Sequence, residues 1–409
     1  MKTLGLYIAV LFLSCAFALG QAQYKILYSF AGPPDGAYPA SEVIRDISGN
    51  LYGTTESGGS SQCEEGCGTV FRLSPNPDGT WSETVLYTFC TEENCTDGQY
   101  PVAGLTIDSA GNLYGVTLTG AVFELSPPVV PADPWTYTLL FQFGLRFGGG
   151  IDPMGRMIFD DSGNLYGTTY EGGTGWGSVF ELSPTPDGWT ETDLYDFCPH
   201  PNVNACIDGN GPQAGVVFDK AGNLYGTTAF GGNSRYFGGG TVYRLSHKDG
   251  EWKETVLYAF PSMFSKRGGA PDGAVTFDAS GNLFGTFSEG GESDDGGVFR
   301  LSRQNGGNEE IVSFDGVNGS VPSSAVLIDP RNNNLYGTAA GNTPNLHGTI
   351  FKIAGKKIIV LHTFGGYPTD GDLPYGGLTS DGHGHLYGTT KIGGPHGPYG
   401  FGTVFEIIP

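Results

Sequence analysis

Aspartates followed by glycine are the residues best suited to bind a ligand. Four such pairs each end three residues before a proline: Asp35-Gly36, Asp97-Gly98, Asp208-Gly209 and Asp370-Gly371. A fifth, weaker copy is Asn318-Gly319. We expect these pairs near a common axis, where the carboxylates could coordinate Ca²⁺ or accept hydrogen bonds from sugar hydroxyls. The alternative is that Asp-Gly forms ordinary turns that repeat with the fold.

Two charged residues interrupt a pattern of small ones. Three residues after each of seven recurring prolines, the chain has Gly or Ala in five places, but Glu42 and Arg156 in the other two. Charges at a position that otherwise holds small residues indicate an asymmetric feature near the centre of the fold. Glu42 and Arg156 could pair with each other, contact a ligand, or simply reach solvent.

Glycine-rich loops carry a second group of candidate binding residues, which are aromatic: Trp176, Tyr236, Phe237, Tyr399 and Phe401. Exposed aromatic rings could stack on sugar rings or anchor a protein partner. The alternative is that they pack the loops against one another.

Signatures of catalysis are weak. His383 and His385 form a His-x-His sequence with no third metal ligand nearby, and no nucleophile-elbow, zinc-protease or phosphate-loop motif occurs in a suitable context. A glycosidase-type pair of carboxylates is defined in space rather than in sequence, and the chain has 42 acidic residues. We therefore assign no catalytic residue and no metal site, and we favour a protein that is not an enzyme.

Six cysteines follow the first twenty residues and form three close pairs: Cys63 and Cys67, Cys90 and Cys95, and Cys198 and Cys206. Six cysteines allow fifteen connectivities, and closeness in sequence favours the three local disulfides. Metal binding is the competing interpretation, but no histidine accompanies the pairs at zinc-like spacing.

A sequence repeated seven times must position all these residues. Gly49 to Thr55 reads Gly-Asn-Leu-Tyr-Gly-Thr-Thr, and its leucine recurs at positions 113, 165, 224, 283, 335 and 386. The spacing runs from 51 residues (Leu335 to Leu386) to 62 (Leu51 to Leu113), near the periods of propeller blades. The tyrosine of the motif is expected in the core between blades.

A turn that begins with aspartate precedes each copy of the motif. Its fourth residue is Gly in six copies, where a positive φ is needed. The sixth copy is one residue longer and has Asn333 instead. Asn is the next best residue for a left-handed conformation, so we expect Asn333 to adopt one.

Each unit predicts four short strands. In the second unit they are residues 103–107, 113–117, 120–126 and 137–143, and the third alternates apolar with small or polar residues. The seventh unit ends at its third strand, Gly402 to Ile408, while a matching fourth strand lies at the N-terminus, Tyr24 to Phe30. We therefore predict an all-β, seven-bladed β-propeller of four-stranded antiparallel blades, whose N-terminal strand completes the last blade. A linear β-solenoid is the alternative, but it gives no reason for the displaced strand.

Three segments carry a resemblance to a known family: the repeated motif, Gly68 to Pro75, and Val85 to Phe89. Over essentially the whole chain after residue 20, the sequence resembles the GloVer tandem-repeat family of exported bacterial proteins, often labelled choice-of-anchor. The resemblance implies a secreted or surface-attached repeat protein of undefined biochemical activity, and it supplies no catalytic residues. Members carry C-terminal sorting segments, whereas this sequence stops on a repeat strand, which favours release over anchoring.

The first twenty residues are typical of a signal peptide, because Lys2 precedes an apolar run from Leu4 to Ala18. We expect cleavage after residue 20, leaving residues 21–409 as a single propeller domain, secreted or periplasmic, with no membrane span. The formal charge of −22 disfavours nucleic acid and anionic membranes as partners, but it tolerates cations and neutral ligands. A monomer is expected, and Ca²⁺ is the only cofactor that the sequence suggests.

These features favour a non-catalytic, exported propeller that binds a glycan or a protein on the face carrying the cysteine loops. Loops held by a rigid scaffold are where binding usually occurs. One alternative is a carbohydrate-active enzyme, a polysaccharide lyase or glycoside hydrolase, with acidic residues at the mouth of the channel. A structural component of the cell envelope is a further alternative, because a fold does not decide a function.

Overall fold

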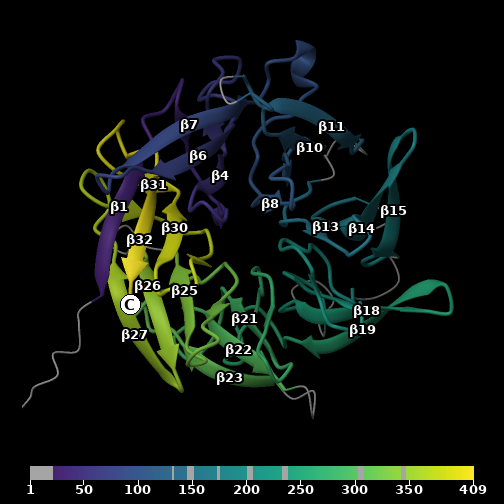
Figure 1. Cartoon of the computed structure of the whole chain (residues 1–409). Coiled ribbons are helices and arrows are strands. Elements are labelled where there is room, and N and C mark those ends of the chain that lie inside the picture. Colours follow the sequence, from purple (N-terminus) through teal and green to yellow (C-terminus); the bar gives the residue numbers. More distant parts are fainter. Residues whose placement is uncertain are drawn as a thin grey trace, which may run out of the picture.

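A computed structural model describes residues 22–130, 133–144, 152–172, 176–199, 206–232, 238–302, 308–341 and 347–409. Seven antiparallel four-stranded sheets stand in a ring around a central axis (Figure 1). The predicted seven-bladed β-propeller is therefore confirmed. Within the described ranges, the only helical segment is a short 3₁₀ turn, η1 (Glu93–Cys95).

In each blade the innermost strand is short and the second strand carries the repeated motif. The innermost strands are β3 (Ile44–Arg45), β8 (Thr106–Ile107), β12 (Ile158–Phe159), β16 (Val217–Phe218), β20 (Thr276–Phe277), β24 (Leu327–Ile328) and β29 (Thr379–Ser380). The second strands are β4 (Leu51–Thr55), β9 (Leu113–Val116), β13 (Leu165–Thr169), β17 (Leu224–Thr228), β21 (Leu283–Phe287), β25 (Leu335–Ala339) and β30 (Leu386–Thr390).

The third and fourth strands are longer and form the outer half of each blade. The third strands are β6 (Thr69–Pro75), β10 (Ala121–Ser126), β14 (Ser178–Thr185), β18 (Thr241–Lys248), β22 (Gly297–Leu301), β26 (Thr349–Ala354) and β32 (Thr403–Ile408). The outermost strands are β7 (Trp81–Thr88), β11 (Thr136–Gln142), β15 (Gly188–Asp196), β19 (Glu251–Ala259), β23 (Asn308–Ser313), β27 (Lys357–Thr363) and β1 (Gln23–Ser29). Two small strand pairs, β2 (Gly36–Ala37) with β5 (Ser57–Gly58) and β28 (Gly371–Asp372) with β31 (Ile392–Gly393), lie outside the blades.

The N-terminal strand closes the ring as predicted. Strand β1 pairs antiparallel with β32, with Tyr24 opposite Ile407 and Ser29 opposite Thr403, in a sheet ordered β1-β32-β30-β29. Figure 1 shows the purple N-terminal strand beside the yellow C-terminal one. The last blade therefore has no unpaired edge on β32.

The aspartate of each turn organises the start of the motif. In the first copy, Asp46 Oδ1 accepts hydrogen bonds from the backbone N–H groups of Ser48 and Asn50, both at 2.9 Å. Its Oδ2 accepts from Asn50 Nδ2 at 2.7 Å and from Tyr52 Oη at 3.1 Å. In this copy the Asn and Tyr of the motif both complete the turn, whereas the fifth copy has Phe284 in place of Tyr and the seventh has His385 in place of Asn. In the sixth copy Asn333 has a φ of +56°, as predicted.

The glycine of the second strand makes room for an aromatic ring. A Cβ on Gly167 would lie 2.5 Å from Cζ of Phe180, which faces it from the third strand. Equivalent close approaches recur in the other six blades, at Gly53, Gly115, Gly226, Gly285, Gly337 and Gly388. This glycine is therefore required by packing.

The same aromatic ring joins one blade to the next. The phenylalanine that follows each outermost strand meets the third-strand aromatic residue of the following blade edge to face, with centroids 4.9 to 5.5 Å apart. The pair Phe30 and Phe71 makes this contact across the closure, between the last blade and the first. Edge-to-face pairs of this kind contribute about 0.5–1.5 kcal/mol each beyond the area they bury.

The first threonine of the motif fastens neighbouring blades near the axis. Thr227 Oγ1 donates to the carbonyl oxygen of Gly273 in the next blade at 3.1 Å. The same bond recurs from Thr54, Thr168, Thr286, Thr338 and Thr389. Each accepting carbonyl lies just before an innermost strand, and the bond joins it to the second strand of the preceding blade. In the second blade the innermost strand, β8, is shorter than the predicted residues 103–107.

Candidate functional site

The two faces of the ring are built differently. An antiparallel meander places the turn between strands one and two, and the hairpin between strands three and four, on one face, which we name the turn face. The loops between strands two and three and the links from blade to blade lie on the opposite face, the link face. All six paired cysteines belong to the link face, as do Trp176, Tyr399 and Phe401 among the predicted aromatic residues.

The link aspartates do not form a ring at the axis. Asp35 Oδ2 accepts hydrogen bonds from Tyr28 Oη at 2.9 Å and from the backbone N–H of Ala31 at 2.8 Å, and Tyr28 lies on the outermost strand β1. The other links repeat this arrangement, in which an outer-strand Tyr or His and a backbone N–H bond to Asp97, Asp208 and Asp370. The expected position near the axis is wrong, because each link leaves an outermost strand and the aspartate bonds back to that strand.

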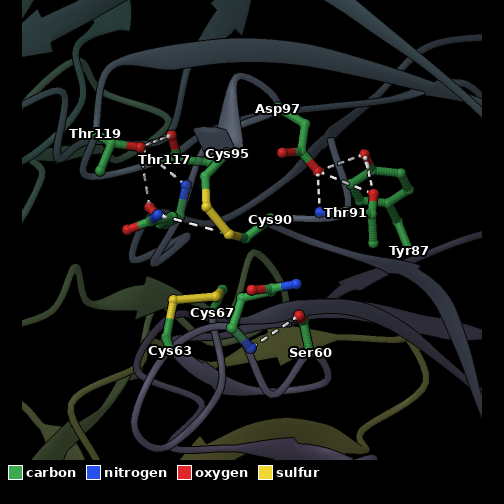
Figure 2. Close-up of a disulfide and its surroundings, with 12 residues drawn as sticks. Ser60, Cys63, Cys67, Tyr87, Cys90, Thr91, Cys95, Asp97, Thr117 and Thr119 are labelled. Carbon is green, nitrogen blue, oxygen red and sulfur yellow. Dashed lines mark hydrogen bonds between the residues drawn. A yellow bond between two sulfur atoms is a disulfide. The ribbon is translucent and has the colours of Figure 1, made fainter. Parts of the chain in front are cut away.

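Asp97 is the most enclosed of these aspartates, with 1% of its surface exposed. Its Oδ2 accepts from Tyr87 Oη at 2.8 Å and from Thr91, as Figure 2 shows. Its backbone carbonyl accepts from Tyr137 of the next blade. Asp97 therefore ties two outer strands to one link. Ca²⁺ binding by the link carboxylates stays a prediction.

Glu42 and Arg156 are brought together near the axis. Arg156 Nη1 lies 3.8 Å from Glu42 Oε1, and both side chains are partly exposed. They belong to the first and third blades, and Gly104 of the second blade leaves space beneath Glu42, whose carboxyl carbon would lie 3.0 Å from a Cβ there. Of the alternatives open from the sequence, pairing is the one observed. An exposed pair of this length contributes little to stability.

The link face is held by a strained backbone conformation that the sequence does not reveal. The residue before the recurring proline has a positive φ in six blades: Tyr38, Tyr100, Gly211, Ala270, Val321 and Leu373. Tyr100 N–H donates to the carbonyl of Cys67 in the preceding blade, and its own carbonyl accepts from Leu118 N–H. Non-glycine residues in this conformation cost of order 1–3 kcal/mol each and persist where surrounding structure fixes them. The residue types vary from blade to blade, so no sequence pattern marks the position.

The predicted aromatic residues differ in exposure. Trp176 is 49% exposed and Tyr399 73% exposed. Phe401 instead packs into the core beside Tyr38. Tyr236 and Phe237 lie outside the described residues.

Other exposed aromatic side chains on this face were missed from the sequence. Phe264, Tyr367 and Tyr375 lie on links and are 72%, 46% and 37% exposed. Together with Trp176 and Tyr399, these residues place exposed aromatic rings on two links and two loops. Tyr367 and Tyr375 share one of the links. The available signal was an aromatic residue in a link that has no counterpart in the other links.

Trp176 differs from the four other tryptophans, which share one role. Trp81 and Trp135 stand at the start of an outermost strand and contact the motif tyrosine of the preceding blade, Tyr387 and Tyr52 respectively. Trp189 and Trp252 occupy the same place and pack into the corresponding clusters. Trp176 lies in a loop and has no such framework position.

A carboxyl group beside the innermost strand β20 was also missed. Asp272 follows the recurring proline of the fifth blade and accepts a hydrogen bond from Ser288. Burial raises the pKa of Asp272 from its ordinary value near 3.8 to about 6; the bond from Ser288 opposes this rise and the charge of Glu289 adds to it. A carboxyl group that titrates near neutral pH can act as a general acid or base.

The three local disulfides are confirmed: Cys63–Cys67, Cys90–Cys95 and Cys198–Cys206. The first lies in the loop between β5 and β6, and the second in the link between β7 and β8. Figure 2 shows these two side by side. Sequence spacing gave the pairing but not this juxtaposition.

Two grooves on the turn face, in the part of the chain that the structure describes, each lie between neighbouring blades. One, of about 900 Å³, lies between the first and second blades beside Trp135, and the other, of about 550 Å³, lies between the sixth and seventh beside Arg331 and Lys352. Trp135 is one of the framework tryptophans, so the larger groove is part of a repeated inter-blade seam. His383 borders the smaller groove and bonds to the Asp381 carbonyl, whereas His385 bonds to Glu406.

Among the described residues, no helix is long and apolar enough to cross a membrane.

Comparison with known proteins gives a family and a fold. The model of the Gloeobacter/Verrucomicrobia repeat matches residues 15–128, 66–273, 118–329 and 236–409. No curated protein matches the sequence.

Solved structures share the architecture at low sequence identity. One is a puromycin hydrolase complexed with PGG, with 11% identity over 87% of this chain and 50% of that chain, and a TM-score of 0.54. Another is the extracellular domain of BT3049, assigned as a hybrid two-component system of B. thetaiotaomicron, with 16% identity over 91% and 39% of the two chains, and a TM-score of 0.53. An α-L-arabinanase of Penicillium chrysogenum complexed with arabinobiose has 14% identity over 94% and 98%, and a TM-score of 0.44. At these identities the likeness to the first two concerns the fold alone.

Proposed function

The chain belongs to the Gloeobacter/Verrucomicrobia repeat family, and we propose that it is a non-catalytic propeller that binds a neutral glycan on its link face. The supporting observation is Trp176, which is half-exposed while the other four tryptophans serve the framework. An indole ring offered to solvent on a rigid scaffold suits stacking against the apolar face of a sugar.

Two further features support a neutral, extended ligand. The chain carries a formal charge of −22, which repels anionic polymers. Exposed aromatic rings stand on several blades, so a polymer could engage more than one at once. Each added contact would then raise the effective affinity through multivalency.

The proposal is tested by binding of the full mature chain to neutral and anionic polysaccharides, measured by calorimetry or on a glycan array. We expect a neutral polysaccharide to bind, and Trp176→Ala to weaken binding by about tenfold, which is about 1.4 kcal/mol. Trp176→Phe should retain part of the affinity. Val129→Ser changes an exposed residue of the turn face and is the matched control. Binding that is unchanged in Trp176→Ala and lost in Val129→Ser would overturn the proposal.

A second candidate function, a carbohydrate-active enzyme, is favoured by Asp272. Its pKa of about 6 suits proton transfer near neutral pH, and it lies beside an innermost strand. Release of reducing ends or unsaturated sugars that disappears in Asp272→Asn, but not in the exposed control Asp78→Asn, would support catalysis. Equal release by both variants would contradict it.

A further inference from the structure

The sulfur atoms of two disulfides form one cluster on the link face. The Sγ atoms of Cys63, Cys67 and Cys90 all lie within 4.8 Å of one another. Cys95 joins them through its bond to Cys90. Within the described residues, this is the only group of three or more Cys, His, Asp or Glu side chains with ligand atoms so close together.

The two segments that carry the cluster are also joined by contacts other than the disulfide bonds. Backbone hydrogen bonds on both sides tie the loop of Cys67 to the link of Cys90. Tyr100 N–H donates to the Cys67 carbonyl at 2.9 Å, and Phe89 N–H donates to the Gly68 carbonyl at 3.0 Å. Cys67 and Cys90 are also buried, at 0% and 3% exposure. The four sulfur atoms should therefore stay near one another when both bonds are reduced.

The spacing and chemistry of these residues match a thiolate metal site. Three residues separate Cys63 from Cys67 and four separate Cys90 from Cys95, within the range usual for zinc ligand pairs. With Zn–S bonds of about 2.3 Å, tetrahedral sulfur ligands lie about 3.8 Å apart. The Sγ atom of Cys90 would have to approach those of Cys63 and Cys67 by at most about 1 Å, and the two sulfur atoms of each reduced pair would have to move apart from bonding distance. Gln99 Nε2 lies 3.7 Å from Cys90 Sγ and can donate to it, as outer-shell groups do around metal ligands.

We propose that the chain, when these two disulfides are reduced, binds one Zn²⁺ through Cys63, Cys67, Cys90 and Cys95. A phosphine reductant and water convert each disulfide to two thiols, and the phosphine becomes a phosphine oxide. The four thiols then release their protons to solvent as the four Zn–S bonds form. Disulfide-bonded and zinc-bound forms are mutually exclusive, so redox conditions select between them.

The experiment uses the full mature chain under anaerobic conditions, with and without a phosphine reductant. Zn²⁺ is added, free metal is removed by gel filtration, and zinc per chain is measured. We expect about one Zn²⁺ in the reduced chain and almost none in the oxidised chain. Zn²⁺ should also raise the melting temperature of the reduced chain alone.

Variants and a spectroscopic probe identify the ligands. Cys63→Ser with Cys67→Ser should abolish retention, whereas Cys198→Ser with Cys206→Ser, which removes the distant third disulfide, should retain one Zn²⁺. Co²⁺ in place of Zn²⁺ should give the sulfur-to-metal charge-transfer absorption of thiolate ligands. Equal zinc retention by the reduced and oxidised chains, equal loss in both double variants, or a Co²⁺ spectrum without this absorption would overturn the proposal. The first and last of these need no variant, so a folding defect cannot decide the result.

Discussion

In the strand framework the same contact recurs at almost every blade, whereas on the link face the blades present different side chains. The edge-to-face aromatic contact occurs seven times, and the close approach of Gly to an aromatic ring also occurs seven times. On the link face, features without a counterpart in the other blades stand out: the exposed Trp176, the pair of Glu42 with Arg156, and the two disulfides in contact. Repeated contacts therefore mark what holds the ring together, and departures from the repeat mark where recognition can differ.

The largest expected effect comes from removing the strand that closes the framework. Deletion of residues 22–30 exposes the edge of β32 and removes the contact of Phe30 with Phe71. We expect loss of cooperative unfolding and aggregation of the product, measured by circular dichroism and light scattering. A synthetic peptide of the deleted residues should restore the folded state in part. An unchanged melting transition would show that the last blade does not need its outermost strand to fold.

A large effect is also expected at the packing glycine. Gly167→Ala places a Cβ 2.5 Å from Cζ of Phe180, so the free energy of unfolding should fall by about 1–3 kcal/mol or more. Gly144→Ala is the matched control, because a Cβ there meets nothing within 4 Å. Urea denaturation of both variants measures the difference. Equal stabilities would show that the repeated glycine is not a packing requirement.

An intermediate effect is expected at the threonine that joins blades. Thr227→Val removes the bond to the Gly273 carbonyl and leaves that buried acceptor unpaired, at a cost of about 1–2 kcal/mol. Thr227→Ser keeps the hydroxyl and should lose less. The second blade has Val116 at this position and serves as a natural comparison. If urea denaturation gives Thr227→Val the same free energy of unfolding as the unchanged chain, this hydrogen bond does not help to hold the blades together.

A pH-dependent effect is expected where a link meets an outer strand. Burial raises the pKa of Glu254 from near 4.5 to about 7, and the charge of Asp208 adds to this rise. Between about pH 4.5 and 7 this carboxyl is ionised in the unfolded chain but still protonated in the folded chain. The free energy of unfolding therefore falls as the pH rises through this range. Glu254→Gln should therefore narrow the stability difference between pH 5 and pH 8, as measured by urea denaturation. Glu251→Gln, at the exposed start of the same strand, should leave that difference unchanged.

The smallest expected effect is a gain in stability at one irregular copy of the framework. Tyr243 replaces the third-strand phenylalanine of the fourth blade, and its buried hydroxyl has no hydrogen-bond partner in the described structure. Tyr243→Phe removes this unpaired group and should raise the free energy of unfolding by about 1 kcal/mol. Phe180→Tyr in the third blade is the reverse test and should lower it. A loss of stability in Tyr243→Phe would show that the hydroxyl has a use the framework does not explain.

Much of the framework could be predicted from the sequence because the residues that form each turn and strand are close together in sequence and recur in every blade. The motif spacing predicted the blades, the displaced segment at Tyr24 predicted the closing strand, and Asn333 adopted the left-handed conformation expected of it. Closeness of the cysteines predicted the three disulfides.

The link face was harder to predict because its contacts join residues far apart in sequence. The position of Asp35 before a proline gave no sign that its carboxylate bonds back to Tyr28 on the outermost strand. The role of Trp135 depends on a tyrosine of another blade, and the pKa of Asp272 depends on burial. The meeting of Cys67 with Cys90 depends on two loops that only the closed ring brings together.

The pairing of β1 with β32 also constrains the order of events during synthesis. Because Gln23 pairs with Ile408, strand β1 has no partner until nearly four hundred further residues have been synthesised. Six blades can form from local contacts before that moment, but the seventh stays incomplete, with open edges at both ends of the growing arc. Contacts of such long sequence separation form late, and an unpaired edge is prone to association. Newly synthesised chains are therefore most prone to aggregate just before the ring closes.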